Sequence, residues 1–384
     1  MAQKRSMQPK YRRRRQMAGA LAIALVILLV GVTGYVFYKR QVVGKRDYNG
    51  QGNGHTVMVR VEDGDSVSGL APELVDKGVV GSRKALILAA EKNQVDLQAG
   101  YYTLQEGMSA DAALAALHDE KNRRGVVDLP TGITLDDVAV VGGKKREGIF
   151  SMVSKQTCVD QNTCISADDL KKAAGQTDLK KLNVPDWAMQ PVSARGDDPR
   201  RLEGLISPGF HVFNPEASAE EIVADLVKDS VETYQETGLE QAATTVNLSP
   251  YQLITAASLV EREAPEGDFD KVARVILNRL KEKQKLEFDS TVNYSVDEQE
   301  IATTDQDRGK MTPWNTYAKE GLPDTPISSP GIKAVQAMEH PAEGDWLYFV
   351  TVDKDGKTVF NRDFADHEAA IQEARKNGVF DSAR

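Results

Sequence analysis

The residues best suited to acid–base chemistry in this sequence are two glutamates, Glu261 and Glu263, which follow an apolar run. Residues two apart point in roughly opposite directions on a helix, so the two carboxyl groups cannot both face one cleft. Glu261 lies one turn beyond Ala257 on the apolar stripe, whereas Glu263 belongs to the wetter side, next to Arg262. A carboxyl group beside apolar surface has its charged form disfavoured, which raises its pKa and suits it to donate a proton. Periodicity alone, however, favours the plainer interpretation, in which such a glutamate faces solvent or pairs with a cation.

A buried helix over residues 250–263 must position this pair. Ser249 is placed to cap the helix, Pro250 suits its first position, and Gln252 completes a capping box. Residues 253–260 are mostly apolar, which predicts burial. Further helices are predicted at residues 219–237 and 269–283, and a C-terminal strand pair at residues 346–352 and 358–360.

Two Pro- and Gly-rich loops, residues 311–323 and 326–331, supply candidate binding groups. They carry Trp, Asn, Thr and Tyr, whose aromatic faces suit sugar rings and whose polar groups suit sugar hydroxyls. The alternative is that Pro and Gly merely stiffen a connection, and the residues alone leave both interpretations open.

Other chemistries lack their motifs. The sequence has no Gly-x-Ser-x-Gly elbow, no phosphate-cradling loop and no nucleotide fingerprint, although a dispersed Ser/His/Asp set remains possible. The five histidines show no zinc-type spacing, so no metal site and no cofactor are predicted. The two cysteines, Cys158 and Cys164, predict a local disulfide, with two free thiols as the alternative.

Charge divides the chain into a basic head and an acidic body. The first 46 residues hold eleven Lys/Arg and no Asp or Glu, so the total of −9 leaves −9 − 11 = −20 for the remainder. An acidic body argues against nucleic acid as the partner, because phosphate binding needs clustered positive charge.

An uncharged apolar run of 22 residues, 17–38, separates the head from the body. This length matches the roughly 20 residues that a membrane-spanning helix needs and exceeds the apolar core of a cleaved signal peptide. Basic residues before the run outweigh those after it, which predicts a cytoplasmic N-terminus. We therefore expect a single-pass protein of the cell membrane with an extracytoplasmic body.

Several motifs, in this order along the chain, resemble the endolytic murein transglycosylase family, also called MltG or YceG-like. The motifs lie at residues 257–264 (Ala-Ser-Leu-Val-Glu-Arg-Glu-Ala), 275–280, 286–292, 315–317, 321–323 and 326–331. Residues 59–71 are also similar to a LysM module, a peptidoglycan-binding unit. The resemblance extends from about residue 57 to the C-terminus and is weakest over residues 144–201.

The pattern of elements and the resemblance together predict an α+β chain in successive parts. These are a basic head (1–16), a transmembrane helix (17–38), a tether (39–55), a LysM-like α+β module (56–125), a linking or inserted segment with the cysteine pair (126–201), and a mixed α/β catalytic domain (202–384). Within the N-terminal half, a strand–Gly turn–Ser/Thr cap–helix pattern recurs three times, with helices predicted at residues 70–75 and 110–118 and from about Leu135 onward.

The resemblance also implies a reaction. A lytic transglycosylase cleaves the MurNAc-β-1,4-GlcNAc bond of nascent peptidoglycan strands without water and leaves 1,6-anhydro-MurNAc ends. One carboxyl group suffices for both proton transfers, and the family's catalytic glutamate matches Glu261. Family motif positions imply substrate-binding roles for Asn278, Asp289, Thr291, Asn315, Tyr317 and Ser328. Peptidoglycan synthases are the candidate partners.

The sequence departs from the family pattern in two places. After Leu202-Glu203-Gly204 it lacks the usual aromatic-rich segment, and the usual Asp-Pro-Thr is Asp289-Ser290-Thr291. Two alternatives stay open, the first of them permitted by the altered segment after Gly204. One is a non-catalytic peptidoglycan-binding scaffold, and the other is a hydrolase that uses Asp289 as a second carboxylate.

Overall fold

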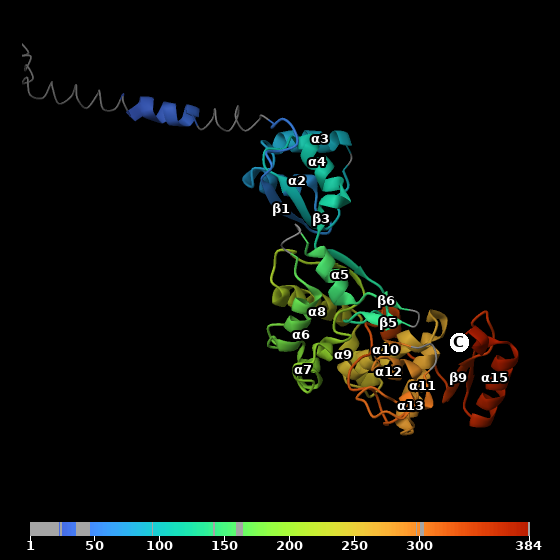
Figure 1. Cartoon of the computed structure of the whole chain (residues 1–384). Coiled ribbons are helices and arrows are strands. Elements are labelled where there is room, and N and C mark those ends of the chain that lie inside the picture. Colours follow the sequence, from blue (N-terminus) through green and yellow to red (C-terminus); the bar gives the residue numbers. More distant parts are fainter. Residues whose placement is uncertain are drawn as a thin grey trace, which may run out of the picture. The chain divides into compact units, whose positions relative to one another are not determined.

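The computed structural model describes residues 23, 25–35, 47–93, 95–140, 143–158, 164–296, 298–299 and 303–382. The chain divides into two compact units, residues 1–123 and residues 124–384 (Figure 1). Unit 1 has one apolar core, and unit 2 has two. Helices and small sheets make both units α+β, as predicted.

The apolar N-terminal segment is described only in part. Residues 25–35 are helical, with exposed apolar side chains such as Ile27 and Leu28. Among the described residues, no helix is both long enough and apolar enough to cross a membrane. The rest of the expected span, residues 17–22, 24 and 36–38, lies outside the described residues, so the anchor stays a prediction.

Unit 1 is built on two antiparallel strands, β1 (Thr56–Val61) and β2 (Gly100–Gln105). Its helices are α2 (Val67–Asp76), α3 (Arg83–Asn93) and α4 (Ala110–His118), followed by η2 (Glu120–Asn122) and the two-residue strand β3 (Arg123–Arg124). Ser66 and Ser109 cap α2 and α4 through their hydroxyl groups. The first two of the three predicted strand–turn–helix patterns are thus confirmed.

The first half of unit 2 surrounds a core that joins residues 127–192 to residues 202–251. It contains the antiparallel strands β4 (Val126–Leu129) and β7 (Gly209–Val212), helices α5 (Ile149–Gln156), α6 (Ala167–Gln176), α7 (Asp186–Ser193) and α8 (Ala219–Glu236), and η3 (Pro199–Leu202). The segment expected to link two domains, residues 126–201, therefore shares a core with the chain that follows it. Cys158 and Cys164 form a disulfide after α5.

The second half of unit 2 is centred on α10 (Pro250–Glu263), whose bounds are those predicted. This helix packs against α9 (Leu239–Thr245), α11 (Phe269–Lys281) and α14 (Ile332–Glu339). The short elements η4 (Glu266–Asp268), α12 (Asp289–Asn293) and α13 (Asp305–Arg308) lie in the connecting segments. All residues of α10 from Leu253 to Val260 are buried, which makes α10 the core helix of this half.

Two small sheets complete unit 2. Strand β5 (Val138–Val140) pairs antiparallel with β6 (Lys144–Arg146) and parallel with β8 (Glu298–Gln299). Strands β9 (Tyr348–Thr351) and β10 (Thr358–Asn361) form the predicted C-terminal hairpin. Helix α15 (Phe364–Lys376) packs beside β9 in Figure 1, and η5 (Val379–Ser382) follows it.

The prediction of a helix from about Leu135 onward was wrong. Residues 131–137 form a loop that leads into β5 instead. The backbone N–H of Leu135 donates to the buried carboxyl group of Glu203, at 3.2 and 3.3 Å from its two oxygens, and the Thr134 hydroxyl donates to Asp136 O. These hydrogen bonds give the polar groups of the loop their partners. The backbone therefore does not have to form a helix to satisfy them.

Candidate active site

The last turn of α10 carries the predicted acid. Ser249 Oγ accepts a hydrogen bond from Gln252 N, and Gln252 Oε1 accepts one from Ser249 N, so the predicted capping box fixes where the helix begins. The buried stretch between Leu253 and Val260 then anchors the helix in the core. Glu261 and Glu263 follow directly, half-buried at the end of α10.

Two glycine-containing loops close over Glu261. Gly331 N donates to Glu261 Oε2 at 3.0 Å, and a Cβ at position 331 would lie 3.2 Å from that oxygen and 2.8 Å from Thr131 Cγ2. Gly132, at φ +69°, lies so close that its Cβ would be 3.5 Å from Glu261 Cγ. The close approach at position 331 therefore favours glycine, whereas at position 132 the contact would be ordinary and the positive φ favours glycine.

The two loops are also bonded to each other and to α10. Gly132 N donates to Ser329 O at 2.9 Å, and Ser329 N donates to Ile133 O at 2.7 Å. Ile327 N donates to Ser258 Oγ at 3.1 Å, one turn before the carboxyl pair. The motif around Ser328 therefore builds the wall beside Glu261. The Ser328 side chain itself is fully buried, and its hydroxyl has no partner among the described residues.

Glu263 lies on the opposite side of α10, but not in the wetter surroundings that we expected. Its Oε1 accepts a hydrogen bond from Ser290 N at 3.4 Å, and Asp289 lies nearby. Burial raises the pKa of Glu263 above its usual value, and the hydrogen bonds from Ser290 oppose this only in part. The expectation failed because α12 packs over this side of the helix.

Asp289 and Tyr317 come together in one cluster. The Tyr317 hydroxyl donates to Asp289 Oδ1 at 2.8 Å, and Thr303 donates to the same oxygen at 2.7 Å. Arg308 binds both Asp289 oxygens through Nε at 3.3 Å and Nη2 at 3.2 Å. The pKa of Tyr317 is raised, mainly by burial and secondly by its hydrogen bond to Asp289. Both Asp289 oxygens are thus already engaged by protein groups.

Three other residues that we predicted to bind substrate form hydrogen bonds with backbone groups. Asn278 donates to the carbonyl oxygens of Gly344 and Trp346 at 3.2 and 2.9 Å. Asn315 is buried and donates to Lys310 O at 2.6 Å, while its carbonyl accepts Tyr317 N. Thr291 is buried and donates to Phe288 O at 2.6 Å. The structure therefore gives these three side chains positioning tasks, and their substrate-binding roles stay predictions.

Glu203 is a functional candidate that the sequence did not single out. It is 1% exposed, and its carboxyl group accepts hydrogen bonds from the Tyr294 hydroxyl at 2.8 Å and from Leu135 N. Burial raises its pKa to about 8. The available signal was one glutamate within the otherwise apolar Leu-Glu-Gly-Leu-Ile, residues 202–206.

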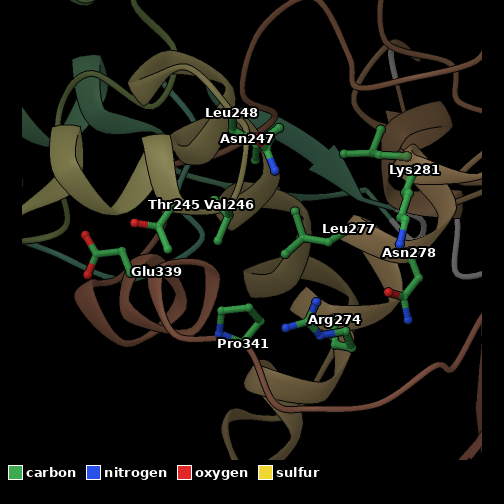
Figure 2. A pocket seen from close by; sticks show the side chains of 11 residues that line it. Thr245, Val246, Asn247, Leu248, Arg274, Leu277, Asn278, Lys281, Glu339 and Pro341 are labelled. Atoms are coloured by element: carbon green, nitrogen blue, oxygen red, sulfur yellow. The ribbon is translucent and has the colours of Figure 1, made fainter.

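Two of the cavities that described residues line are in this half of unit 2. One, of about 480 Å³, lies beside Glu263, Asp289 and Tyr317. The other, of about 580 Å³, lies between the end of α9, α11 and the end of α14, and Figure 2 shows Arg274, Asn278 and other side chains around it. The larger cavity is lined by neither Glu261 nor Glu263, and the smaller one is lined by Glu263 but not by Glu261. No cluster of metal-ligating side chains occurs in the part of the chain that the structure describes.

Comparisons with known proteins agree with one another. Residues 59–373 match the YceG-like family. An endolytic murein transglycosylase of Bacillus subtilis (strain 168) is 31% identical over 321 residues, which cover 82% of this chain and 84% of the relative. One of Streptococcus pneumoniae serotype 2 is 27% identical over 83% of this chain, but only 58% of that relative is covered. The crystal structure of a YceG-like protein from Listeria monocytogenes is similar, with a TM-score of 0.50, 25% identity, and coverage of 82% of this chain and 99% of that one.

Proposed function

This chain belongs to the YceG-like family, and we propose that it is a peptidoglycan lytic transglycosylase. The substrate would be nascent glycan strands, cleaved internally at MurNAc-β-1,4-GlcNAc bonds to leave 1,6-anhydro-MurNAc ends. The names of the relatives support the enzyme class. The observation that carries the finer proposal is the placement of Glu261 at the end of a rigid buried helix, under two loops that approach it through glycine.

In the proposed reaction, Glu261 transfers both protons. Its carboxyl group protonates the glycosidic oxygen as the C1–O4 bond breaks, and the resulting carboxylate takes the proton from the C6 hydroxyl as O6 bonds to C1. The proton count balances and no water is consumed. The bond from Gly331 N to Oε2 fixes the direction of the carboxyl group, and no hydrogen bond among the described residues occupies Oε1, so Oε1 is the oxygen we assign to proton transfer.

The engagement of Asp289 supports a transglycosylase over a hydrolase. A hydrolase needs a second carboxylate that can activate a water molecule. Asp289, the candidate for that role, already accepts hydrogen bonds from Thr303, Tyr317 and Arg308. A carboxylate engaged in this way has little capacity left to take a proton from water.

We also propose that the protein acts at the outer face of the cell membrane. Residues 17–38 would be its single-pass anchor, with the basic head in the cytoplasm and both units outside. Residues 56–125 would be a LysM-like module, and peptidoglycan synthases would be partners. The charge distribution along the sequence supports the orientation.

The test is mass spectrometry of purified glycan strands after incubation with the full-length protein. We expect internal fragments with anhydro ends, and a rate roughly 100- to 10,000-fold lower for Glu261→Gln, because general acid–base catalysis is lost. Glu266→Gln is the matched control, since Glu266 pairs with Lys333 at the surface, and it should cleave at the wild-type rate.

Each other outcome has a distinct meaning. Products one water heavier would make the protein a hydrolase. Abolished cleavage in Glu263→Gln, with Glu261→Gln active, would assign the acid to Glu263. If the wild-type protein binds strands but leaves them intact, the scaffold alternative is correct.

A further inference from the structure

The loop that carries Gly132 is held by a buried carboxyl group that takes no part in the proposed proton transfers. Glu203 accepts a hydrogen bond from Leu135 N, at 3.2 and 3.3 Å from its two oxygens, and one from the Tyr294 hydroxyl at 2.8 Å. Leu135 lies in loop 131–137, three residues after Gly132, and Tyr294 is the residue that ends α12. One carboxyl group therefore connects this loop to the end of α12.

The same loop is bonded to the wall beside Glu261. Ser329 O accepts a hydrogen bond from Gly132 N at 2.9 Å, and Ser329 N donates to Ile133 O at 2.7 Å. Two residues further along the chain, Gly331 N donates to Glu261 Oε2 at 3.0 Å. Because these bonds follow one another, a displacement of the loop would move the N–H group that directs the carboxyl group of the proposed acid.

The surroundings of Glu203 suit a neutral carboxyl group better than a carboxylate. Among the residues that the structure describes, no ion pair includes Glu203. Arg200 attracts it only from a distance, because Asp198 binds the Arg200 guanidinium through Nε and Nη2, both at 3.1 Å. The other titratable groups that face Glu203 carry no positive charge, and they are Asp136, Tyr251 and Tyr294. Burial raises the pKa of Glu203 to about 8, so the group is mostly protonated near pH 7.

Ionisation of Glu203 would disturb the loop that it holds. A carboxylate buried without a paired cation is costly, and water that reaches it lowers this cost. Loop 131–137 reaches the surface at Thr131 and Asp136, so its displacement would admit that water. The same displacement would pull on the bonds between the loop and Ser329.

We propose that Glu203 is a positioning residue for the cleavage reaction, whose neutral carboxyl group holds loop 131–137 and thereby keeps Gly331 bonded to Glu261. Glu203 acts through the loop and touches neither the substrate nor the reacting atoms. This inference rests on the proposed function, since it concerns the reaction that Glu261 performs. The enzyme should therefore lose activity when Glu203 ionises, whereas a glutamine at this position has no proton to lose and should keep the loop in place.

The test compares cleavage of purified glycan strands by the full-length wild-type and Glu203→Gln proteins at pH 5.5 and pH 9. Because every other group is shared, the ratio of the two rates at one pH isolates Glu203. At pH 5.5 the rates should agree within about twofold, since both side chains are neutral. At pH 9 about nine-tenths of the Glu203 groups would be ionised, so the ratio of Glu203→Gln to wild type should rise about tenfold.

Two further variants separate positioning from general stability. Glu203→Leu cannot accept the hydrogen bond from the loop, so it should cleave at least about tenfold more slowly at pH 5.5 when circular dichroism shows that it is folded. Glu339→Gln is the matched control. Glu339 is also buried with a raised pKa and accepts the Thr237 hydroxyl at 2.5 Å, but it lies at the other end of α14 from Gly331. Its rate relative to the wild type should be the same at both pH values.

Hydrogen–deuterium exchange, followed by mass spectrometry, measures the loop without any cleavage. At pH 9 the backbone amides of residues 131–137 and 326–331 should exchange faster in the wild type than in Glu203→Gln. The two proteins are compared at the same pH, so the chemical exchange rate of an open amide is equal in both. Peptides from unit 1 should exchange alike, because Glu203 lies in unit 2.

The outcomes keep the loop and the reaction apart. A rate ratio that stays constant from pH 5.5 to pH 9, in folded and active proteins, would overturn the proposal. An equal rise for Glu339→Gln would also overturn it, because any buried carboxyl group would then have the same effect. Faster exchange of the two loops in the wild type, in a protein that never cleaves strands, would support the holding of the loop by Glu203 and reject the proposed reaction.

Discussion

Replacing Glu203 by glutamine should change how the stability of unit 2 depends on pH. This carboxyl group is 1% exposed and bonded to Leu135 N and Tyr294 Oη, and the other ionisable groups that face it are Asp136, Arg200 and Tyr251. Burial raises its pKa from the ordinary 4.5 to about 8. Glutamine has nearly the same shape and can keep both hydrogen bonds, but it has no proton to lose.

The direction follows from proton binding in the two states. Between pH 4.5 and about 8, the folded protein keeps the proton on Glu203 while the unfolded chain has released it. The stabilisation is therefore complete below pH 4.5, declines as pH rises, and is lost by about pH 8. At about 1.4 kcal/mol per pH unit, this interval corresponds to a loss of up to about 5 kcal/mol.

The assay is urea unfolding of the full-length proteins at pH 5, 7 and 8.5, followed by tryptophan fluorescence. All three tryptophans, Trp187, Trp314 and Trp346, lie in unit 2, so the signal reports on the unit that contains Glu203. The free energy of unfolding of Glu203→Gln minus that of the wild type should increase from pH 5 to pH 8.5 by several kcal/mol.

The control is Glu221→Gln. Glu221 is exposed, and its hydrogen bonds with Ser218 lower its pKa, so its ionisation affects stability only at lower pH. Its difference from the wild type should stay constant between pH 5 and pH 8.5. If the Glu203→Gln difference is equally constant, the carboxyl group is ionised in the folded protein and the reasoning is refuted.

Two glycine substitutions test the approach of the loops. Gly331→Ala places a Cβ 2.8 Å from Thr131 and against the carboxyl group of the proposed acid, so cleavage should fall about tenfold or more at a temperature where the variant is folded. Gly267→Ala, whose Cβ would meet nothing within 4 Å, should leave both cleavage and melting temperature unchanged. Gly204→Ala introduces a side chain at φ +76° with its Cβ 2.5 Å from Pro326, and urea unfolding should show a loss of about 2 kcal/mol or more; an unchanged midpoint would contradict the packing described.

The local elements around the site could be predicted because their signals are local. The start of α10 is encoded within four residues by Ser249, Pro250 and Gln252, and its burial by the apolar stretch that follows. Such caps and periodicities need no knowledge of the rest of the fold. The C-terminal hairpin was predicted in the same way, as a strand pair at residues 346–352 and 358–360. The family motifs likewise identified the family that the comparisons show.

The roles of individual side chains depended on contacts between distant positions. The loop at Leu135 follows from Glu203, 68 residues later, and the burial of Glu263 follows from α12. The Asn278 side-chain amide donates hydrogen bonds to the carbonyl oxygens of Gly344 and Trp346. No motif in the sequence reveals this engagement.

The sequence by itself determined the family, the helix that carries the two glutamates, the neighbouring helices at residues 219–237 and 269–283, and the C-terminal hairpin. Only the tertiary structure decided which side of α10 each carboxyl group faces, which motif residues are engaged in holding the backbone, and that β9 and α15 enclose a cavity beside Glu263. The physical reason is that helix caps and periodicity act over a few residues. Burial, close glycine contacts and shared hydrogen bonds arise only when segments about 70 residues apart are packed together.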